Sequence, residues 1–466
     1  MQDQLKDWFV PLHVENHFVG MPVSSVNALH ISSNSASFSP LALKSTSSFD
    51  LLLSASLFEH PAKETVLRPV KSIDNIFYTE EKEYKIFWKI DRGKNMVDVY
   101  LLKAKEGDCL FVRYGNENEM HNILIDGGCA ECGHTVERII KQCDNNNEKI
   151  DLVVVTHVDE DHIGGLITGF ASVNEEILKR SIQRIAFNTS RGFLQHNKLN
   201  GKIRKTEEAV KVIVCEGDGC SIGDAKSLCD IINEKGLKCK LEDYIVSGTE
   251  MIIGNAKLTI LSPDEQSLSA FMNKWEEENN CESAGGCSNE FPEEIYKDLT
   301  ALKKEKYPGA DASLSNRASI AFLFEYEDVK ILFLGDAAAP IYTKELKKYM
   351  KNEKISIDVV KMSHHGSSRS ISKRFLDSID AEVFMVSSNG TTLKGQHTVP
   401  GKIAIAKLLN RRNKVILLNN YCWWKYAYQN QYFTINDIRE YFDTKLLELY
   451  KISDNQFRKK QVLNTV

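Results

Sequence analysis

Residues 153–165 decide the fold, and they read Val153-Val-Val-Thr-His-Val-Asp-Glu-Asp-His-Ile-Gly-Gly165. The apolar run predicts a buried strand that ends at Thr156. Four potential metal ligands follow within six residues: His157, Asp159, Asp161 and His162. In extended chain, positions 157, 159 and 161 project to the same side and can converge on a metal, with His162 turned towards a neighbouring one. The two glycines predict that a helix start approaches another element closely.

Three segments further along the chain carry more potential ligands, each after an apolar strand. Segment 331–336 ends in Asp336, segment 358–368 contains His364 and His365, and segment 387–397 ends in His397. Five of the twelve histidines lie in these three segments and in residues 153–165. This concentration favours a shared site over a chance distribution. Ligands at the ends of successive strands share one rim of a sheet sandwich, as in a metal-dependent hydrolase.

The rest of the chain predicts sheets that are covered by helices. Short β-branched and aromatic runs predict strands at 97–102, 109–114 and 122–125, and helical spacing predicts helices at 136–143 and 221–235. A hairpin is expected over 251–263 and a strand pair over 318–334, after which strands and helices alternate to about residue 426. This order favours an α/β architecture.

In order along the chain, these motifs resemble the metallo-β-lactamase fold, and within it the branch of the C-terminal hydrolase domain of the DNA-uptake protein ComEC. That branch has an aspartate where most members have the second histidine, as at Asp159. Residues 106–112, 123–128 and 316–319 also resemble segments of the branch. The resemblance covers roughly residues 95–425 and implies an αβ/βα four-layer sandwich, to which an N-terminal appendage is added.

The resemblance also implies roles for the site residues. His157 and Asp159 would hold one metal, Asp161 and His162 the other, and Asp336 would bridge them. Either His364 or His365, together with His397, would complete the shells, and Asp126 would orient a ligand histidine or hold a turn. The family's usual third-motif histidine has no match, since Asn316 or Ser319 stands there, and His397 is not followed directly by proline. The resemblance is therefore compatible with two bound metals and also with one tightly bound metal.

The ligand types indicate the metal and the reaction. The set contains imidazoles and carboxylates, and an aspartate at 159 favours manganese or magnesium, with zinc as a close competitor. A metal-bound water would attack an electrophilic carbonyl or phosphorus. Asp161 and the free histidine of the 364–365 pair, which we assign to His365, would transfer protons. Lys361, Ser367 and Ser368 would offer a cation and hydroxyls to phosphate oxygens, unless this loop is simply solvated.

The expected function is therefore a metal-dependent phosphodiesterase or nuclease that acts on nucleic acid or a nucleotide. An ester or lactone hydrolase of the same fold is the first alternative. A regulatory, partner-binding subunit of a multi-protein system, such as a defence system, is the second.

Composition and charge set the boundaries of this interpretation. The chain has 466 residues, of which 42% are hydrophobic and 26% charged, and a net charge of −5, so a nucleic-acid substrate would have to meet local basic patches. The first twenty residues lack a signal peptide's apolar stretch, and the eleven cysteines do not resemble a small disulfide framework. We expect a cytoplasmic protein with no membrane span.

The chain is expected to have three parts. They are an appendage at 1–90 that could bind a protein partner, a hydrolase domain at 91–426 with an insertion at about 275–307, and a helical extension at 427–466.

Overall fold

The computed structural model describes residues 95–116, 118–199, 220–277, 293–310, 313–349, 353–390, 399–425 and 432–451. All of them belong to the second of two compact units, Lys82–Val466. The expected appendage at 1–90 and the expected ligand His397 lie outside the described residues, so both stay predictions. Among the helices described, none is long and apolar enough to cross a membrane.

Six strands form the first sheet, in the order β1-β2-β3-β4-β5-β6. They are β1 (Asn95–Leu101), β2 (Leu110–Asn116), β3 (Met120–Ile125), β4 (Leu152–Val154), β5 (Ile185–Ala186) and β6 (Leu241–Glu242). The first three are antiparallel neighbours, and β3 to β6 run parallel to one another. The strands expected at 97–102, 109–114 and 122–125 are thus confirmed, and the site motif follows β4.

Eight strands form the second sheet, in the order β16-β15-β14-β12-β10-β9-β8-β7. They are β7 (Glu250–Ile253), β8 (Ala256–Ser262), β9 (Ala321–Tyr326), β10 (Val329–Phe333), β12 (Val359–Lys361), β14 (Val383–Val386), β15 (Val415–Asn419) and β16 (Leu447–Lys451). A separate short pair joins β11 (Ile355–Ser356) to β13 (Ile379–Asp380). Asp336 and His365 follow β10 and β12, which are parallel neighbours, so the expected rim of strand ends is present.

The C-terminal segment differs from the helical extension expected there. Its described part, 432–451, contains helical turns at α13 (Ile435–Asp437) and Ile438–Phe442, but it ends in β16. β16 pairs in parallel with β15 and buries Leu447. Alternating side chains in the Leu-Glu-Leu-Tyr-Lys run suit a strand with one covered face, and this segment therefore extends the sheet of the hydrolase domain.

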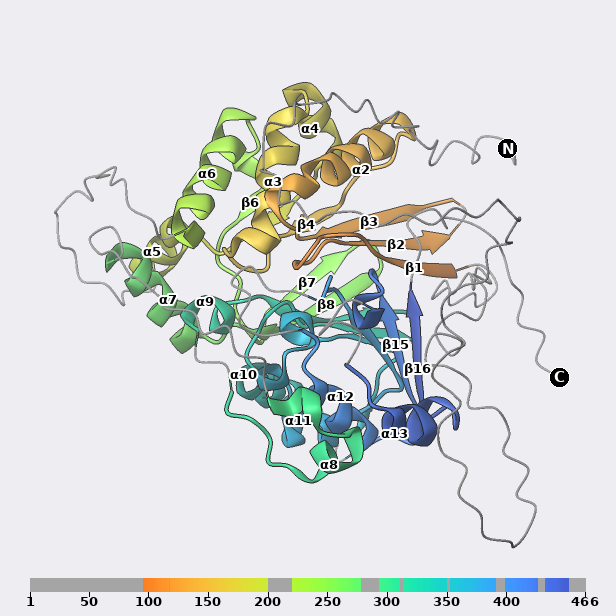
Figure 1. Ribbon diagram of the computed structural model, residues 1–466. Coiled ribbons are helices and arrows are strands. Elements are labelled where there is room, and N and C mark those ends of the chain that lie inside the picture. Colours follow the sequence, from red (N-terminus) through yellow and green to blue (C-terminus); the bar gives the residue numbers. More distant parts are fainter. Residues whose placement is uncertain are drawn as a thin grey trace, which may run out of the picture. The chain divides into compact units, whose positions relative to one another are not determined.

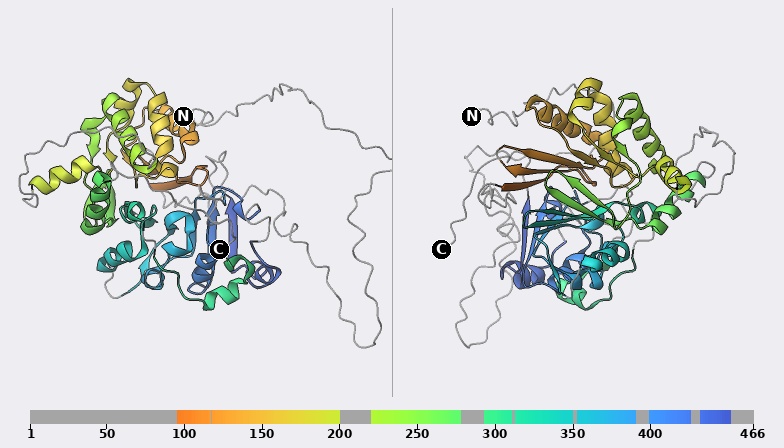
Figure 2. Two further views of the ribbon diagram at one scale, coloured as in Figure 1. Left: turned by 60° about the vertical axis from the view of Figure 1, so that its left-hand side comes forward. Right: turned by 180° about the vertical axis from the view of Figure 1, so that it is seen from behind.

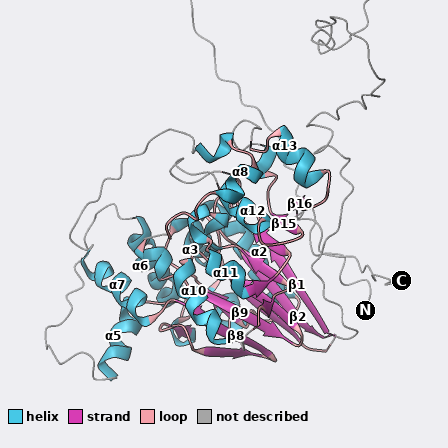
Figure 3. Ribbon diagram, turned by 90° about the horizontal axis from the view of Figure 1, so that it is seen from below, coloured by secondary structure: helices cyan, strands magenta, loops and turns pink. Residues whose placement is uncertain are grey.

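Helices cover the outer faces of the two sheets, and Figures 1 and 2 show the resulting layers. Figure 3, seen from below, separates helices from strands by colour. Over the first sheet lie α2 (Gly133–Asn145), α3 (Glu160–Ser172), α4 (Glu175–Ser181) and α6 (Cys220–Glu234). Over the second lie α10 (Ala339–Leu346), α11 (Lys373–Ser378) and α12 (Lys402–Leu409). The remaining α-helices are α5 (Ser190–Leu199), α7 (Glu265–Glu277), α8 (Leu299–Lys304) and α9 (Leu314–Arg317).

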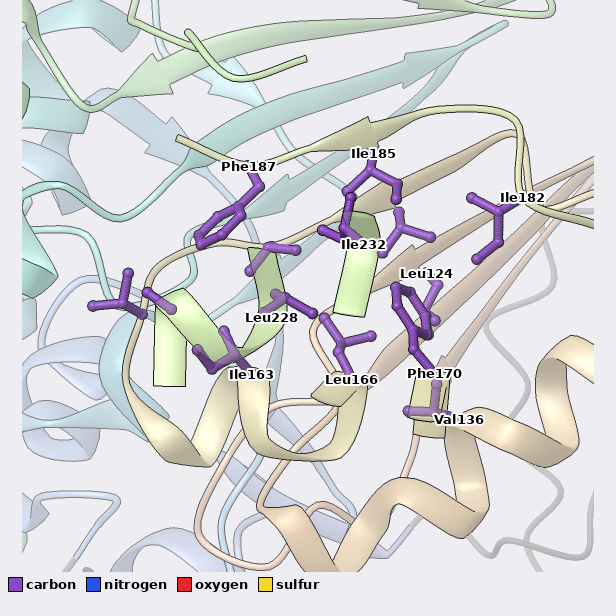
Figure 4. Packing of buried hydrophobic residues seen from close by; sticks show 14 of the residues in the cluster. Leu124, Val136, Ile163, Leu166, Phe170, Ile182, Ile185, Phe187, Leu228 and Ile232 are labelled. Carbon is purple, nitrogen blue, oxygen red and sulfur yellow. The ribbon is translucent and has the colours of Figure 1, made fainter. Parts of the chain in front are cut away.

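Strand alternation divides the apolar core in two. On β2, Phe111 points to the helices, whereas Leu110 and Val112 point to the other sheet. The helix-facing cluster is drawn in Figure 4, where Leu166 and Phe170 of α3 lie beside Leu228 and Ile232 of α6. The other cluster lies between the sheets. Helices α10, α11 and α12 form the fourth layer. Their side chains line a small cavity against β12 and β14. The expected four-layer αβ/βα sandwich is thus the observed fold.

Candidate metal centre

The motif that follows β4 combines a loop with a helix start. Asp159 is the residue before α3 and has extended backbone angles, φ −70° and ψ 143°, and α3 begins at Glu160. The extended alternation expected over 157–161 therefore holds only as far as Asp159. Asp161 and His162 lie on the first helical turn, because acidic residues in this turn favour the start of a helix. Within this turn, Asp161 Oδ2 and His162 Nε2 lie 3.8 Å apart.

Glycines let three segments meet behind the site. A Cβ on Gly165 would lie 2.0 Å from the Gly127 carbonyl oxygen, and one on Gly107 would lie 1.6 Å from the Asp161 carbonyl oxygen. The Gly127 N–H donates to the His162 carbonyl at 2.8 Å, and the Gly165 N–H donates to the Gly128 carbonyl at 2.8 Å. The close approach predicted from the two glycines after His162 is therefore confirmed.

Four side chains converge where the strands of both sheets end: Asp161, His162, Asp336 and His365. His162 Nε2 lies 3.4 Å from Asp336 Oδ1 and 3.8 Å from Asp161 Oδ2. His365 Nε2 lies 3.3 Å from Asp161 Oδ2 and 3.4 Å from Asp336 Oδ2. Donors about 2.0–2.2 Å from one tetrahedral ion are about 3.3–3.6 Å apart. His162, Asp336 and His365, with Asp161 beside both histidines, thus have approximately the spacing of metal ligands.

The far nitrogens of the two histidines have hydrogen-bond partners that orient the rings. His162 Nδ1 lies 2.8 Å from Asp126 Oδ2, and His365 Nδ1 lies 3.0 Å from the Ser387 carbonyl oxygen. Asp126 also accepts hydrogen bonds from the Thr156 N–H and hydroxyl, at 2.8 and 2.7 Å. Because both Nδ1 atoms face partners, the Nε2 atoms face the cluster. The orienting role that the resemblance implies for Asp126 agrees with this arrangement.

A second group adjoins the first and is more open. His157 Nε2 lies 3.5 Å from Asp159 Oδ2, and the rings of His157 and His162 are 4.1 Å apart. Ser315 of α9 donates a hydrogen bond to Asp159 Oδ1 at 2.7 Å. The Asp159 side chain is 31% exposed, whereas that of His157 is buried. The structure therefore brings His157 and Asp159 together, as the resemblance implies.

The two adjacent histidines of segment 363–366 have unequal positions. Both adopt left-handed backbone angles, with φ 49° at His364 and 54° at His365, a conformation that costs energy in residues other than glycine. His365 is buried in the cluster. His364 is partly exposed, with Nε2 3.8 Å from Asp336 Oδ2 and Nδ1 3.3 Å from the Asn316 amide nitrogen. The ligand position expected of His364 is thus occupied by His365, while His364 lies nearer to solvent and to Asn316.

Lys361 does not lie where a substrate phosphate could reach it. Its side chain is 1% exposed, and its ammonium group forms an ion pair with Asp108 and donates to the Gly335 carbonyl at 3.3 Å. The substrate contact expected of Lys361 is therefore wrong, because the side chain of the last residue of β12 turns inward between the sheets.

Asp108 is a site residue that the sequence interpretation did not assign. Asp108, His162, Asp336 and His365 each offer a ligand-type atom within 4.8 Å of the others. However, Asp108 faces the Nδ1 atoms, 3.4 Å from that of His365 and 4.0 Å from that of His162. We therefore place it behind the two rings rather than at the metal. The available signal was the Glu106-Gly-Asp108 turn, which resembles a family segment.

Several buried polar atoms of the cluster lack hydrogen-bond partners among the described residues. They are His157 Nε2, His162 Nε2, Asp336 Oδ1, His365 Nε2 and, behind the two rings, Asp108 Oδ1. Burying a polar atom without a partner costs free energy, and these are the imidazole and carboxylate atoms that bind divalent cations. The donor set thus fits a divalent metal.

The charges of the cluster predict that metal binding releases protons. Burial alone would lower the pKa values of His162 and His365. The Asp336 carboxylate instead raises both pKa values well above the usual 6.5. Asp161 and Asp126 add to this effect at His162, and Asp108 adds to it at His365. Because these pKa values are raised in the folded protein, the two protonated histidines stabilise the metal-free protein below about pH 6.5. This stabilisation is lost as the pH rises through the pKa values of the folded protein. A metal needs neutral imidazoles, so its affinity should rise roughly tenfold per pH unit for each proton released.

Calorimetric titration of the chelator-treated protein in buffers of different ionisation enthalpy would count these protons. Binding that is independent of pH between about 6 and 8, with no proton released, would contradict the charge assignment.

Comparison with known proteins gives one family and one curated relative. Residues 103–168 match the model of the metallo-beta-lactamase superfamily. The anti-Pycsar protein Apyc1 of Bacillus phage BSP38 is 36% identical over 88 residues, which are 19% of this chain and 32% of that protein. The chain thus matches about a third of the length of this relative.

Solved structures also match part of this chain, at low identity. The metallo-beta-lactamase fold protein YhfI from Bacillus subtilis matches with a TM-score of 0.31 and 9% identity, over 76% of this chain and 95% of that one. CmlA, a diiron beta-hydroxylase from Streptomyces venezuelae, matches with a TM-score of 0.32 and 11% identity, over 76% of this chain and 52% of that one. Residues 103–168, which include the motif after β4, are thus similar to the metallo-beta-lactamase superfamily.

Proposed function

We propose that this protein is a metal-dependent phosphodiesterase that acts on nucleic acid or a nucleotide. The observation that carries the hydrolase part is the buried cluster of Asp161, His162, Asp336 and His365, whose ligand-type atoms are spaced for a metal. A general metal-dependent hydrolase is what the superfamily supports. The phosphodiester is our own inference.

Each side chain of the site has a defined task in this proposal. Asp161, His162, Asp336 and His365 would hold one divalent metal, and His157 and Asp159 would take part in a second site. Such metals supply a nucleophilic water and neutralise negative charge on the substrate. Asp161 accepts a proton, and the partly exposed His364, held by Asn316 at 3.3 Å, is placed to donate one to the leaving group.

Two observations support a phosphodiester over an ester or lactone. The site is rich in carboxylates, which suits the hard divalent cations that bind phosphate oxygens, and its motifs resemble those of the ComEC branch. Lys361 gives no such support because it is buried. The similarity to an anti-Pycsar protein of a phage supports a role in phage defence or its suppression. We place the protein in the cytoplasm, where thiols stay reduced, and propose residues 1–90 as the binding region for a protein partner.

A substrate panel tests the proposal. Purified protein, after metal analysis, is incubated with bis-p-nitrophenyl phosphate, single- and double-stranded DNA, RNA, nucleotides and a lactone, each with manganese and with zinc. We expect phosphodiester turnover, with manganese at least as effective as zinc. Lactone turnover without phosphodiester turnover would select the ester-hydrolase alternative, and a protein that binds no metal would select the regulatory subunit.

A further inference from the structure

The ion pair between Lys361 and Asp108 joins the two halves of the sandwich beneath the metal centre. Lys361 ends β12 of the second sheet, and Asp108 lies in the turn that connects β1 to β2 of the first. Both side chains are 1% exposed. A buried ion pair contributes little net stability compared with apolar packing, but removing one partner leaves the other charge uncompensated. The place of this pair therefore calls for an explanation beyond stability.

Asp108 contacts two of the segments that carry the predicted ligands and also the segment that follows Asp126. Its N–H donates to the Asp161 carbonyl at 3.2 Å, and its carbonyl accepts from the Gly128 N–H at 2.7 Å. Its carboxylate lies 3.4 Å from His365 Nδ1 and 4.0 Å from His162 Nδ1. Asp108 thus faces the side of each ring opposite to the one that faces Asp161 and Asp336.

Lys361 in turn contacts the segment that carries Asp336. Its ammonium group donates to the Gly335 carbonyl at 3.3 Å, and the N–H of His364 donates to the same oxygen at 3.0 Å. One lysine thus holds the carboxylate behind the two histidines and also the backbone just before Asp336.

We propose that Lys361 and Asp108 are positioning residues that set the affinity of the metal site, through the rings of His162 and His365 and the backbone before Asp336. This inference rests on the proposed metal site, but not on the identity of the substrate. Residues that orient metal ligands typically contribute 10- to 100-fold in metal affinity when they are mutated. A lysine that bound phosphate would instead change KM and leave the metal affinity unchanged.

The test compares Lys361→Met, Asp108→Asn and the double variant by metal affinity, measured in competition with a chelator. We expect each single variant to bind metal at least tenfold more weakly. With saturating metal, the KM of each should stay within about twofold of the unmutated protein. The double variant, which has no uncompensated charge, should lose less affinity than the two single losses combined. Because affinity is measured without substrate, a failed phosphodiesterase assay would not affect this result.

A matched control comes from a second buried ion pair, Lys402–Asp437, whose side-chain nitrogen and oxygen are 2.9 Å apart and whose side chains are equally covered. Lys402→Met should lower the melting temperature and leave the metal affinity within about twofold. Unchanged metal affinity in Lys361→Met and Asp108→Asn, or an equal loss in Lys402→Met, would overturn the proposal. If Lys361→Met does not fold, Asp108→Asn and the double variant still decide it.

Discussion

Asp336→Ala should lose at least one bound metal per chain and nearly all hydrolytic activity, with the fold preserved. Its carboxylate lies 3.4 Å from the Nε2 atoms of both His162 and His365, so its removal takes away a ligand and the negative charge between two rings. We expect kcat/KM to fall about a thousandfold or more, which corresponds to about 4 kcal/mol of transition-state stabilisation.

Metal analysis, circular dichroism and turnover of the substrate found in the panel check this result. Asp358→Ala is the control, since Asp358 lies before β12, at the end opposite to the site, where its carboxylate accepts a hydrogen bond from the Lys330 N–H at 2.8 Å. It should keep full metal content and activity. Full metal content together with unmutated activity in Asp336→Ala would show that the ligand assignment is wrong.

Gly107→Ala should destabilise the fold and disturb the site at once. Its new Cβ would lie 1.6 Å from the Asp161 carbonyl oxygen, and no side-chain rotation can relieve a contact with backbone. The segment 106–108 or the start of α3 must therefore move. Overpacking of this severity costs about 3 kcal/mol or more, and the movement should also weaken metal binding.

Chemical unfolding of the chelator-treated and metal-loaded forms measures this cost. Gly223→Ala is the matched control, because nothing lies within 4 Å of a Cβ at that position in α6. There we expect a gain of roughly 0.5–1 kcal/mol, the difference between alanine and glycine in a helix. Equal stability of the two alanine variants would be incompatible with the close packing of Gly107 on Asp161.

Much of the site follows from the sequence because strand ends are easy to locate. The apolar runs before His157, Asp336 and His365 predict strands, and parallel neighbours bring their ends together. What the sequence leaves open is the direction of side chains. Lys361 stands three residues before His364, and the motif does not show that its side chain turns inward to Asp108.

Two further differences have local causes. The residues after Asp159 can continue as extended chain or start a helix, and the acidic pair at 160–161 that favours the helix also suits a metal motif. β16 is only five residues long, and its pairing with β15 depends on a contact that the sequence of residues 427–466 does not carry. Long-range pairing, more than local propensity, decided both the last strand and the role of Asp108.

The position of the metal site across both sheets has a consequence for motion. Asp161 and His162 come from the first half of the sandwich and Asp336 and His365 from the second, so a bound ion would cross-link segments about 170 to 200 residues apart in the chain. At a metal concentration a hundredfold above Kd, such binding adds about 2.7 kcal/mol to stability. On metal addition, hydrogen–deuterium exchange should then slow together at the backbone amides after β4, β10 and β12. Binding of one metal would thus be detected at three places that are distant in the sequence.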